Sequence, residues 1–158
     1  MLFGISNCSS HSRGRVQIKS NNPLEHPVIE PNYLSNKEDL KNLLEGVKVL
    51  RKLAKTNSFR EVIGEEFRPG PQCQTDEQMI KHIKDTVWTV FHPSSTCKMG
   101  PNTKNNVVDS SLKVHGIECL RVADASIFPQ LVCGNINAAT IMVGEKASDL
   151  ILQDKVNI

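Results

Sequence analysis

Aromatic residues are scarce in this sequence of 158 residues, at 4%, and the formal net charge at pH 7 is only +2. Nucleic-acid-binding domains usually carry a stronger basic excess, often with aromatic platforms for stacking bases, so that function is not expected. No apolar run approaches the roughly 18 residues of a transmembrane helix. The first residues also lack the basic start and apolar core of a secretory signal. The sequence therefore leaves the cellular compartment unassigned.

The cysteines give no framework for disulfides or for a zinc ribbon. Their number is odd, their spacing is long and irregular, and no C-x-x-C pair occurs. Paired cysteines at short, regular spacing are typical of both kinds of site. We therefore interpret all five as free thiols that behave as small hydrophobic side chains. They are Cys8, Cys73, Cys97, Cys119 and Cys133.

Three segments carry helix signals. Ser35 and Glu38 have the spacing of a capping box, and leucines and valines follow at intervals of three and four up to about residue 55. Thr75 and Gln78 form a second capping box, before a helix with Met79, Ile80, Ile83 and Val87 on its buried side. A third helix is predicted over residues 137–153, with Ile141, Met142, Ala147, Leu150 and Ile151 on one period.

Strand signals surround these helices. Alternating polar and apolar residues predict a half-buried strand over residues 13–20, and three prolines then favour an extended, turning loop. A reversal at His115–Gly116 between apolar runs predicts paired strands over residues 107–122. This order favours an α+β fold, in which an antiparallel or mixed sheet packs with helices.

Two places combine polar side chains with an interrupted backbone. His92 follows the apolar run of residues 87–91, which we expect to be buried, and Pro93 disfavours helix there, so its imidazole can face a cavity from a strand end. Residues 133–139 place glycine and asparagine just before the third helix, whose free N–H groups attract negative charge. On residue type alone, His92 can equally be structural, and Asn135 or Asn137 can simply cap the helix.

The other histidines and the acidic residues offer a weaker alternative. A metal hydrolase built from His92, His115 and Asp109 can be drawn, but its spacing matches no ligand pattern. We expect no metal site. His11, His26, His82 and His115 are interpreted as structural or solvated.

Four blocks of sequence, in order, resemble the carboxyl-terminal region of the glucose–methanol–choline (GMC) flavin oxidoreductases. The family patterns are H-P-x-G-T-x-x-M-G, V-V-D-x-x-L-x-V-x-G, L-R-V-x-D-A-S-x-x-P and G-[NH]-x-N-A-x-x-x-x-x-x-E-K-x-x-D. They match residues 92–100, 107–116, 120–129 and 134–149. The resemblance extends through residues 13–16, 22–24 and 31–34, so it covers nearly the whole chain.

The resemblance implies an enzyme that oxidises the CH–OH group of a small alcohol and passes the hydride to N5 of FAD. His92 falls at the position of the family's proton acceptor, and Asn135 at the second member of its His–Asn pair. A neutral imidazole, with a reference pKa of about 6.5, can take the hydroxyl proton, and the amide can bind the substrate oxygen. The resemblance places further residues against the flavin, namely Asp124, Ala125, Asn135, Ile136, Asn137 and Ala138.

Two departures from the family pattern are visible. Ser95 stands where the first block has glycine, which tolerates backbone conformations that serine does not. The nine glycines form no G-x-G-x-x-G, so the unit that holds the FAD pyrophosphate is absent from this sequence. We therefore expect residues 1–105 to be substrate-domain sequence and residues 106–158 to return to a missing amino-terminal FAD domain, which the last helix rejoins. The alternative is a non-catalytic remnant or interaction module that does not bind flavin alone.

Overall fold

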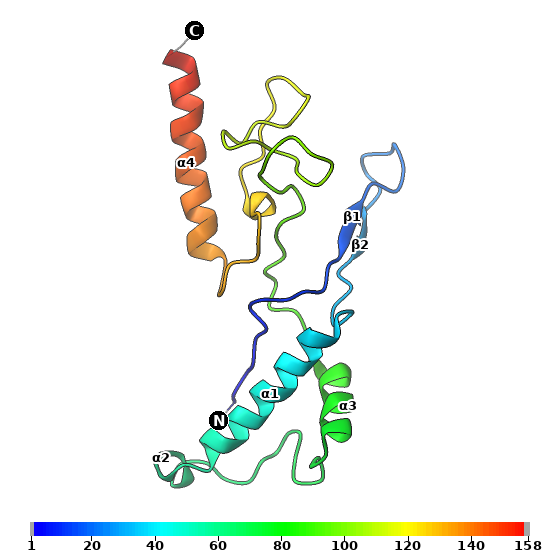
Figure 1. The fold of residues 1–158 in the computed structure, drawn as a ribbon, viewed down its shortest axis with the longest axis vertical. Coiled ribbons are helices and arrows are strands. Elements are labelled where there is room, and N and C mark those ends of the chain that lie inside the picture. Colours follow the sequence, from blue (N-terminus) through cyan, green and yellow to red (C-terminus); the bar gives the residue numbers. More distant parts are fainter. Residues whose placement is uncertain (1, 157–158) are drawn as a thin grey trace. The chain divides into compact units, whose positions relative to one another are not determined.

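The computed structural model describes residues 2–156 and divides the chain into two compact units, Met1–Trp88 and Thr89–Ile158. Each unit has its own cluster of buried hydrophobic side chains. Helices and a small antiparallel sheet together are consistent with the α+β class (Figure 1). The expected division near residue 105 concerns the parts of a whole enzyme and stays a prediction.

The first unit is organised around helix α1, Lys37–Ala54. Its N-cap is Asn36, whose side chain accepts a hydrogen bond from the Glu38 N–H at 2.9 Å. The predicted cap at Ser35 was therefore wrong by one residue. The backbone N–H of Asn36 donates to Oγ of Ser12 at 3.1 Å, so a residue 24 positions away helps to fix where the helix begins.

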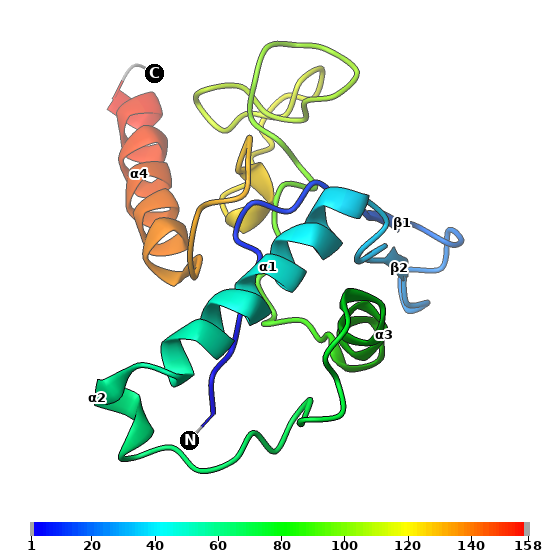
Figure 2. The ribbon, with the colours of Figure 1, turned by 60° about the horizontal axis from the view of Figure 1, so that its bottom comes forward.

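Helix α3, Asp76–Thr86, lies beside α1 (Figures 1 and 2). The predicted capping box of Thr75 and Gln78 is confirmed, and so is the burial of Met79 and Ile83. Val87 follows the helix and is 41% exposed, so its predicted burial was wrong. A short helix α2, Asn57–Arg60, precedes the connecting loop. The buried cluster between the helices comprises Leu43, Leu44, Cys73, Met79 and Ile83.

Residues 3–12 form an extended segment along α1, here called the amino-terminal strap (Figure 2). The ring of Phe3 packs edge-on against that of Phe59, with centroids 5.7 Å apart. Ile5 fits against Gly46, where a Cβ atom would come within 2.7 Å of its Cγ2. At the other end of the helix, the strap surrounds the carboxylate of Asp39.

Strands β1, Arg15–Gln17, and β2, Val28–Glu30, form an antiparallel pair in which Val16 faces Ile29. The strand predicted over residues 13–20 is thus present but shorter, and the proline-rich loop contains its partner. The apolar residues of the predicted strand, Val16 and Ile18, are 52% and 89% exposed, so the predicted half-burial was wrong. In the described residues, this pair is the whole sheet.

The second unit builds its core from turns rather than regular strands. Isolated bridges join Met99 to Val108, Val108 to Val114 and Lys113 to Arg121, where paired strands were predicted. A one-turn 3-10 helix, η1, spans Ala125–Ile127. The buried residues of this core are Val108, Leu112, Ile127, Phe128, Val143 and Ala147.

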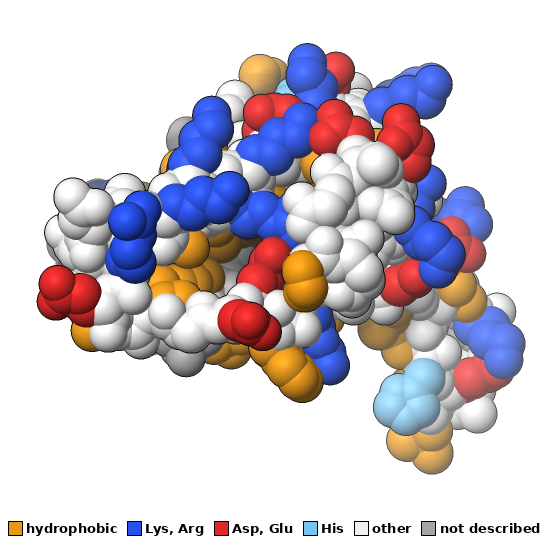
Figure 3. Space-filling view, turned by 90° about the horizontal axis from the view of Figure 1, so that it is seen from below, with side chains coloured by type: hydrophobic (Ala, Val, Ile, Leu, Met, Phe, Trp, Pro, Cys, Tyr) orange, Lys and Arg blue, Asp and Glu red, His pale blue; other side chains and the backbone are white. Residues whose placement is uncertain are grey.

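Helix α4, Asn137–Val156, confirms the predicted third helix. Val143 and Ala147 form its buried side, whereas Ile141 and Met142, which belong to the predicted period, are 59% and 58% exposed. Hydrophobic side chains also reach the surface elsewhere, between charged ones (Figure 3). Among the described helices, none has the length and apolar character that crossing a membrane requires.

Candidate functional site

His92 is half-buried and lies in irregular backbone, between Phe91 and Pro93. The preceding run is not a buried strand as predicted, because Val90 and Phe91 are 50% and 73% exposed. Burial of an apolar run needs a partner surface, and the sequence pattern does not say whether that surface lies in the same chain. Phe91 itself has φ of 61°, a left-handed conformation that turns the chain immediately before His92.

Ser95 adopts a backbone conformation that favours glycine. Its φ is 70°, in the left-handed region where a Cβ atom meets steric strain. The family pattern has glycine at this position, so the chain keeps the glycine-type bend although the residue has changed. The Oγ atoms of Ser94 and Ser95 lie 3.2 Å apart on this bend.

A ladder of backbone hydrogen bonds joins the segment after His92 to the η1 turn. The N–H groups of Ser95, Cys97 and Met99 donate to three successive carbonyl oxygens, those of residues 125, 126 and 127. The distances are 3.2, 2.8 and 2.8 Å. The structure thus brings the first and third sequence blocks together, and with them the neighbourhoods of His92 and Ala125.

Asp124 caps the η1 turn. Its side chain accepts a hydrogen bond from the Ser126 N–H at 2.8 Å, and it is exposed, while Ala125 is half-buried. This bond satisfies an N–H group that a one-turn helix leaves without a partner. Ile127 and Phe128 directly after it are buried at 2% and 6% exposure, which attaches the turn firmly to the core.

Residues 135–138 form the entry to helix α4. Asn135, Asn137 and Ala138 are exposed, and Ile136 packs against the core of the second unit. Thr140 makes the first backbone bond of the helix, to the Ile136 carbonyl at 2.9 Å. In the part of the chain that the structure describes, the N–H groups of residues 137–139 have no acceptor.

These positions share one unit but not one hydrogen-bond network. Backbone bonds connect the His92 segment to the η1 turn, and the core connects that turn to α4 through Phe128 and Val143. Within residues 2–156, no hydrogen bond joins the side chains of His92 and Asn135. Their convergence on one ligand is therefore a proposal.

The entry to α4 fits an electron-rich ligand. A helix of 20 residues with unsatisfied N–H groups and no acidic side chain in its first turn presents a positive dipole end to solvent. Ala138 and Ala139 add little bulk, so a planar group can approach the backbone. This donor set suits the flavin of FAD, whose reduced form carries negative charge on the ring.

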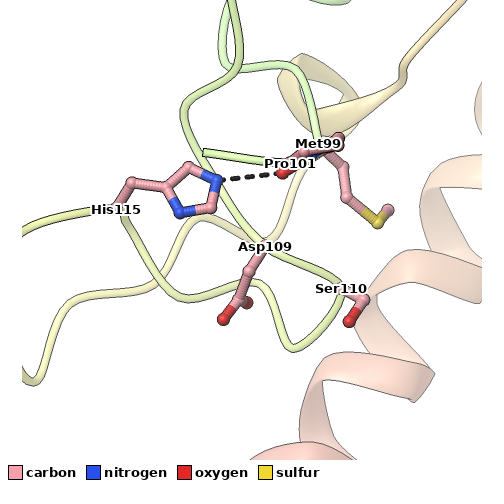
Figure 4. Close-up of a pocket in the computed structure, with 6 residues that line it drawn as sticks. Met99, Pro101, Asp109, Ser110 and His115 are labelled. Carbon is pink, nitrogen blue, oxygen red and sulfur yellow. Dashed lines mark hydrogen bonds between the residues drawn. The ribbon is translucent and has the colours of Figure 1, made fainter. Parts of the chain in front are cut away.

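A shallow, open pocket of about 380 Å³ lies elsewhere in the second unit (Figure 4). His115 reaches across it, with Nε2 2.9 Å from the carbonyl oxygen of Gly100. Oδ1 of Asp109 accepts the N–H groups of Ser111 and Lys113, at 2.8 and 2.9 Å. Both side chains thus hold the local backbone. Among the described residues, no group of three or more His, Cys, Asp or Glu could hold a metal ion, which leaves the metal-hydrolase alternative without support.

Asp39 of the first unit is a buried charged residue, at 1% exposure, that the sequence patterns did not indicate. Oδ1 and Oδ2 accept hydrogen bonds from Asn7, Ser10, His11 and Ser12. Burial alone would raise the pKa of this carboxyl, but the bonds from His11, Ser12 and Ser10 outweigh it and hold the pKa far below its usual range. No local pattern marks Asp39, because its donors lie 27 to 32 positions away.

Comparison with known protein families identifies one match over most of the chain. The model of the carboxyl-terminal GMC oxidoreductase domain matches residues 10–144. An oxygen-dependent choline dehydrogenase of Escherichia coli is 44% identical over 147 residues, which is 93% of this chain. The same stretch is 26% of the bacterial enzyme, so the chain spans about a quarter of the length of the curated relatives it matches.

Solved structures give the same result. A formate oxidase of Aspergillus oryzae superposes with a TM-score of 0.85 at 32% identity, over 98% of this chain and 26% of the oxidase. An FAD-dependent oxidoreductase of Chaetomium thermophilum superposes with a TM-score of 0.84 at 28% identity, over 90% of this chain and 25% of that protein. A fungal aryl-alcohol oxidase superposes with a TM-score of 0.78 at 33% identity, over 90% of this chain and 24% of the oxidase.

Proposed function

Because this chain belongs to the GMC oxidoreductase family, whose cofactor is FAD, we propose that it forms the substrate-side, carboxyl-terminal part of an enzyme that oxidises the CH–OH group of a small alcohol. Its coverage of about a quarter of its relatives supports this placement. So does the absence of a G-x-G-x-x-G from its sequence. The partner is then an amino-terminal FAD domain, which α4 rejoins.

His92 accepts the hydroxyl proton of the substrate in this proposal. An alcohol is far too weak an acid to lose its proton unaided at neutral pH, whereas an unprotonated ring nitrogen of imidazole can take it as the C–H bond breaks. The ladder from Ser95 to Met99 carries the argument, because it holds the His92 segment against the turn at Asp124–Ala125. The bound FAD supplies the two-electron acceptor for the hydride.

Asn135 holds the substrate oxygen. Its amide cannot act as a base at neutral pH, but the NH₂ group can donate a hydrogen bond to that oxygen and orient the reacting carbon. Its exposed position directly before α4 leaves the amide accessible to a ligand. The backbone N–H groups of Asn137 and Ala138 would hold the flavin, and the positive end of the helix would stabilise negative charge on it.

The substrate is a small alcohol, and choline is the first to test. The bacterial relative at 44% identity is a choline dehydrogenase, whereas the similar solved structures include an aryl-alcohol oxidase and formate oxidases. Choline and an aryl alcohol therefore form the first panel, and formate, which has no alcohol group, is the contrasting compound. These compounds differ in charge and shape, so their relative activities indicate which charge and shape the substrate pocket accepts.

The decisive experiment replaces the matching carboxyl-terminal quarter of the Escherichia coli choline dehydrogenase with this chain. We expect the purified chimera to retain FAD, visible by flavin absorbance, and choline or the aryl alcohol to bleach it without oxygen. A folded, flavin-containing chimera that no substrate reduces, while the unmodified bacterial enzyme is reduced by choline, would contradict the proposal. Loss of flavin from a folded chimera would instead favour a non-catalytic remnant.

A further inference from the structure

The backbone path at His92 depends on contacts outside its own segment. Residues 87–96 contain no helix or strand, and left-handed residues stand on both sides of His92, at Phe91 and Ser95. The first backbone bond after the histidine runs from the Ser95 N–H to the carbonyl of Ala125. The position of His92 is therefore set to a large degree by the position of that carbonyl.

The carbonyl of Ala125 is in turn fixed by the η1 turn. Two backbone bonds close the turn, from Ile127 to Asp124 and from Phe128 to Ala125, at 3.2 and 3.4 Å. The bond from the Ser126 N–H to the Asp124 carboxylate is shorter, at 2.8 Å. Short 3-10 turns have poor internal hydrogen-bond geometry, so a side-chain cap contributes much of what holds them.

The same turn is anchored on its far side. Ile127 and Phe128 are buried in the core with Val143 and Ala147 of α4. The turn thus connects two structures: the ladder that leads to His92 and the core that supports the entry of α4. A loss of order in η1 affects the ladder first, because its three carbonyls are the acceptors of all three bonds.

We propose that Asp124 is a positioning residue for His92, acting through the η1 turn and the 95–99 backbone ladder. The inference about the backbone stands on this structure, while its consequence for alcohol oxidation rests on the proposed function. Asp124 requires no contact with the substrate for this role. An oxygen acceptor on its side chain is sufficient, so the asparagine variant retains the role and the alanine variant loses it.

The test compares Asp124→Ala, Asp124→Asn and Asp109→Ala in the 158-residue chain. Asp109→Ala is the matched control, since it removes an aspartate cap of the same unit that bonds to Ser111 and Lys113 instead. Amide hydrogen exchange is measured at Ser95, Cys97 and Met99, and the imidazole resonances of His92 are recorded by NMR.

We expect roughly fivefold to tenfold faster exchange at the three amides in Asp124→Ala, together with shifted His92 resonances. Asp124→Asn should match the wild type, and Asp109→Ala should leave Ser95 and His92 unchanged. Unaltered exchange and resonances in Asp124→Ala overturn the proposal. So do equal changes in Asp109→Ala, which reduce Asp124 to an ordinary stabilising residue. If Asp124→Ala unfolds, Asp124→Gly, which also lacks a side-chain acceptor, takes its place under the same criteria.

A second readout uses the flavin-containing enzyme. Asp124→Ala should slow flavin reduction about tenfold at saturating alcohol with little change in the apparent affinity for alcohol, because a displaced base affects the chemical step. Equal rates in Asp124→Ala and wild type contradict the catalytic consequence. Absence of flavin reduction in every form, wild type included, contradicts the proposed function but leaves the exchange result standing.

Discussion

The backbone N–H of Ser12 lies 2.7 Å from Oδ2 of Asp39, and the hydroxyl of the same serine binds the same oxygen. A residue of the amino-terminal strap thus bonds twice to a carboxylate in the first turn of α1. Ser10 and His11 add further donors, and Nδ1 of the His11 ring lies 3.6 Å from Oδ1, so hydrogen bonds and an imidazole surround Asp39 without a lysine or arginine. Asp39 therefore holds the strap at the start of α1, while Ile5 contacts the helix further along at Gly46.

Asp39→Ala should destabilise the first unit by about 2–4 kcal/mol, because it leaves several donors of the strap without an acceptor. Hydrogen exchange over α1, read by mass spectrometry in increasing urea, measures this loss locally. Asp85→Ala is the control, since its exposed ion pair with Lys81 is worth less than about 1 kcal/mol. Equal effects of the two substitutions would contradict the assigned role of Asp39.

The stability of the first unit should fall in acid for the same reason. The pKa of Asp39 is lowered in the folded state, so its contribution is present above the unfolded value of about 3.9 and is lost as the pH falls below it. Urea midpoints of the first unit at a series of pH values test this. Asp39→Asn cannot ionise, so the part of the acid dependence below about pH 4 should be weaker in that variant.

The N-cap of α1 can be tested by a pair of neighbouring substitutions. Asn36→Ala should destabilise α1 by about 1 kcal/mol, since its side chain accepts the Glu38 N–H, whereas Ser35→Ala should have little effect. Thermal unfolding followed by circular dichroism distinguishes them. A larger loss in Ser35→Ala would show that the helix begins where the sequence pattern placed it.

The strained bend after His92 predicts opposite effects on stability when each of two adjacent serines, Ser94 and Ser95, is replaced by glycine. Ser95→Gly relieves a residue at φ of 70° and should be neutral or stabilising, while Ser94→Gly adds freedom to the unfolded chain and should be destabilising. Both variants lose the contact between the two Oγ atoms, so that loss does not affect their difference. The difference should be about 1–2 kcal/mol. Denaturant unfolding of the second unit measures it, and a difference near zero would show that Ser95 carries no strain.

His92→Ala in the flavin-containing enzyme should slow flavin reduction by about 10²–10⁴-fold, the usual contribution of a positioned proton acceptor. Asn135→Ala should slow it less, because water can replace part of its hydrogen bonding. Anaerobic stopped-flow mixing with alcohol gives the rate directly. His82→Ala is the control and should leave the rate unchanged, since His82 is a half-buried residue of α3 whose imidazole lies near Thr86. Unchanged reduction in His92→Ala would remove this histidine from the mechanism.

The sequence predicted the positions of the helices better than it predicted which residues are buried and which distant residues contact them. The capping box of Thr75 and Gln78 is a local signal, and the structure contains it. The cap of α1 moved from Ser35 to Asn36, where the distant Ser12 binds the Asn36 N–H, and no local pattern contains that contact. Val90 and Phe91 are exposed because burial depends on a partner surface, which periodicity does not reveal.

The candidate site shows the same limit. Motifs defined by spacing along the sequence identified His92, Asn135 and the Asp124–Ala125 turn, and the roles of these residues stay predictions. The ladder that joins residues 95–99 to residues 125–127 consists only of backbone groups, so no pattern of side chains could predict it. Its acceptors lie about 30 residues from its donors, and only a folded structure relates the two.

The contact between Ile5 and Gly46 has a consequence for anyone who engineers this region. Glycine in the middle of a helix is a standard target for replacement by alanine, since alanine gains about 1 kcal/mol in an open helix. Here the new methyl group would lie within 2.7 Å of Ile5 and force that side chain out of its seat. Gly46→Ala, a substitution that stabilises most helices, would therefore weaken the contact between the strap and α1.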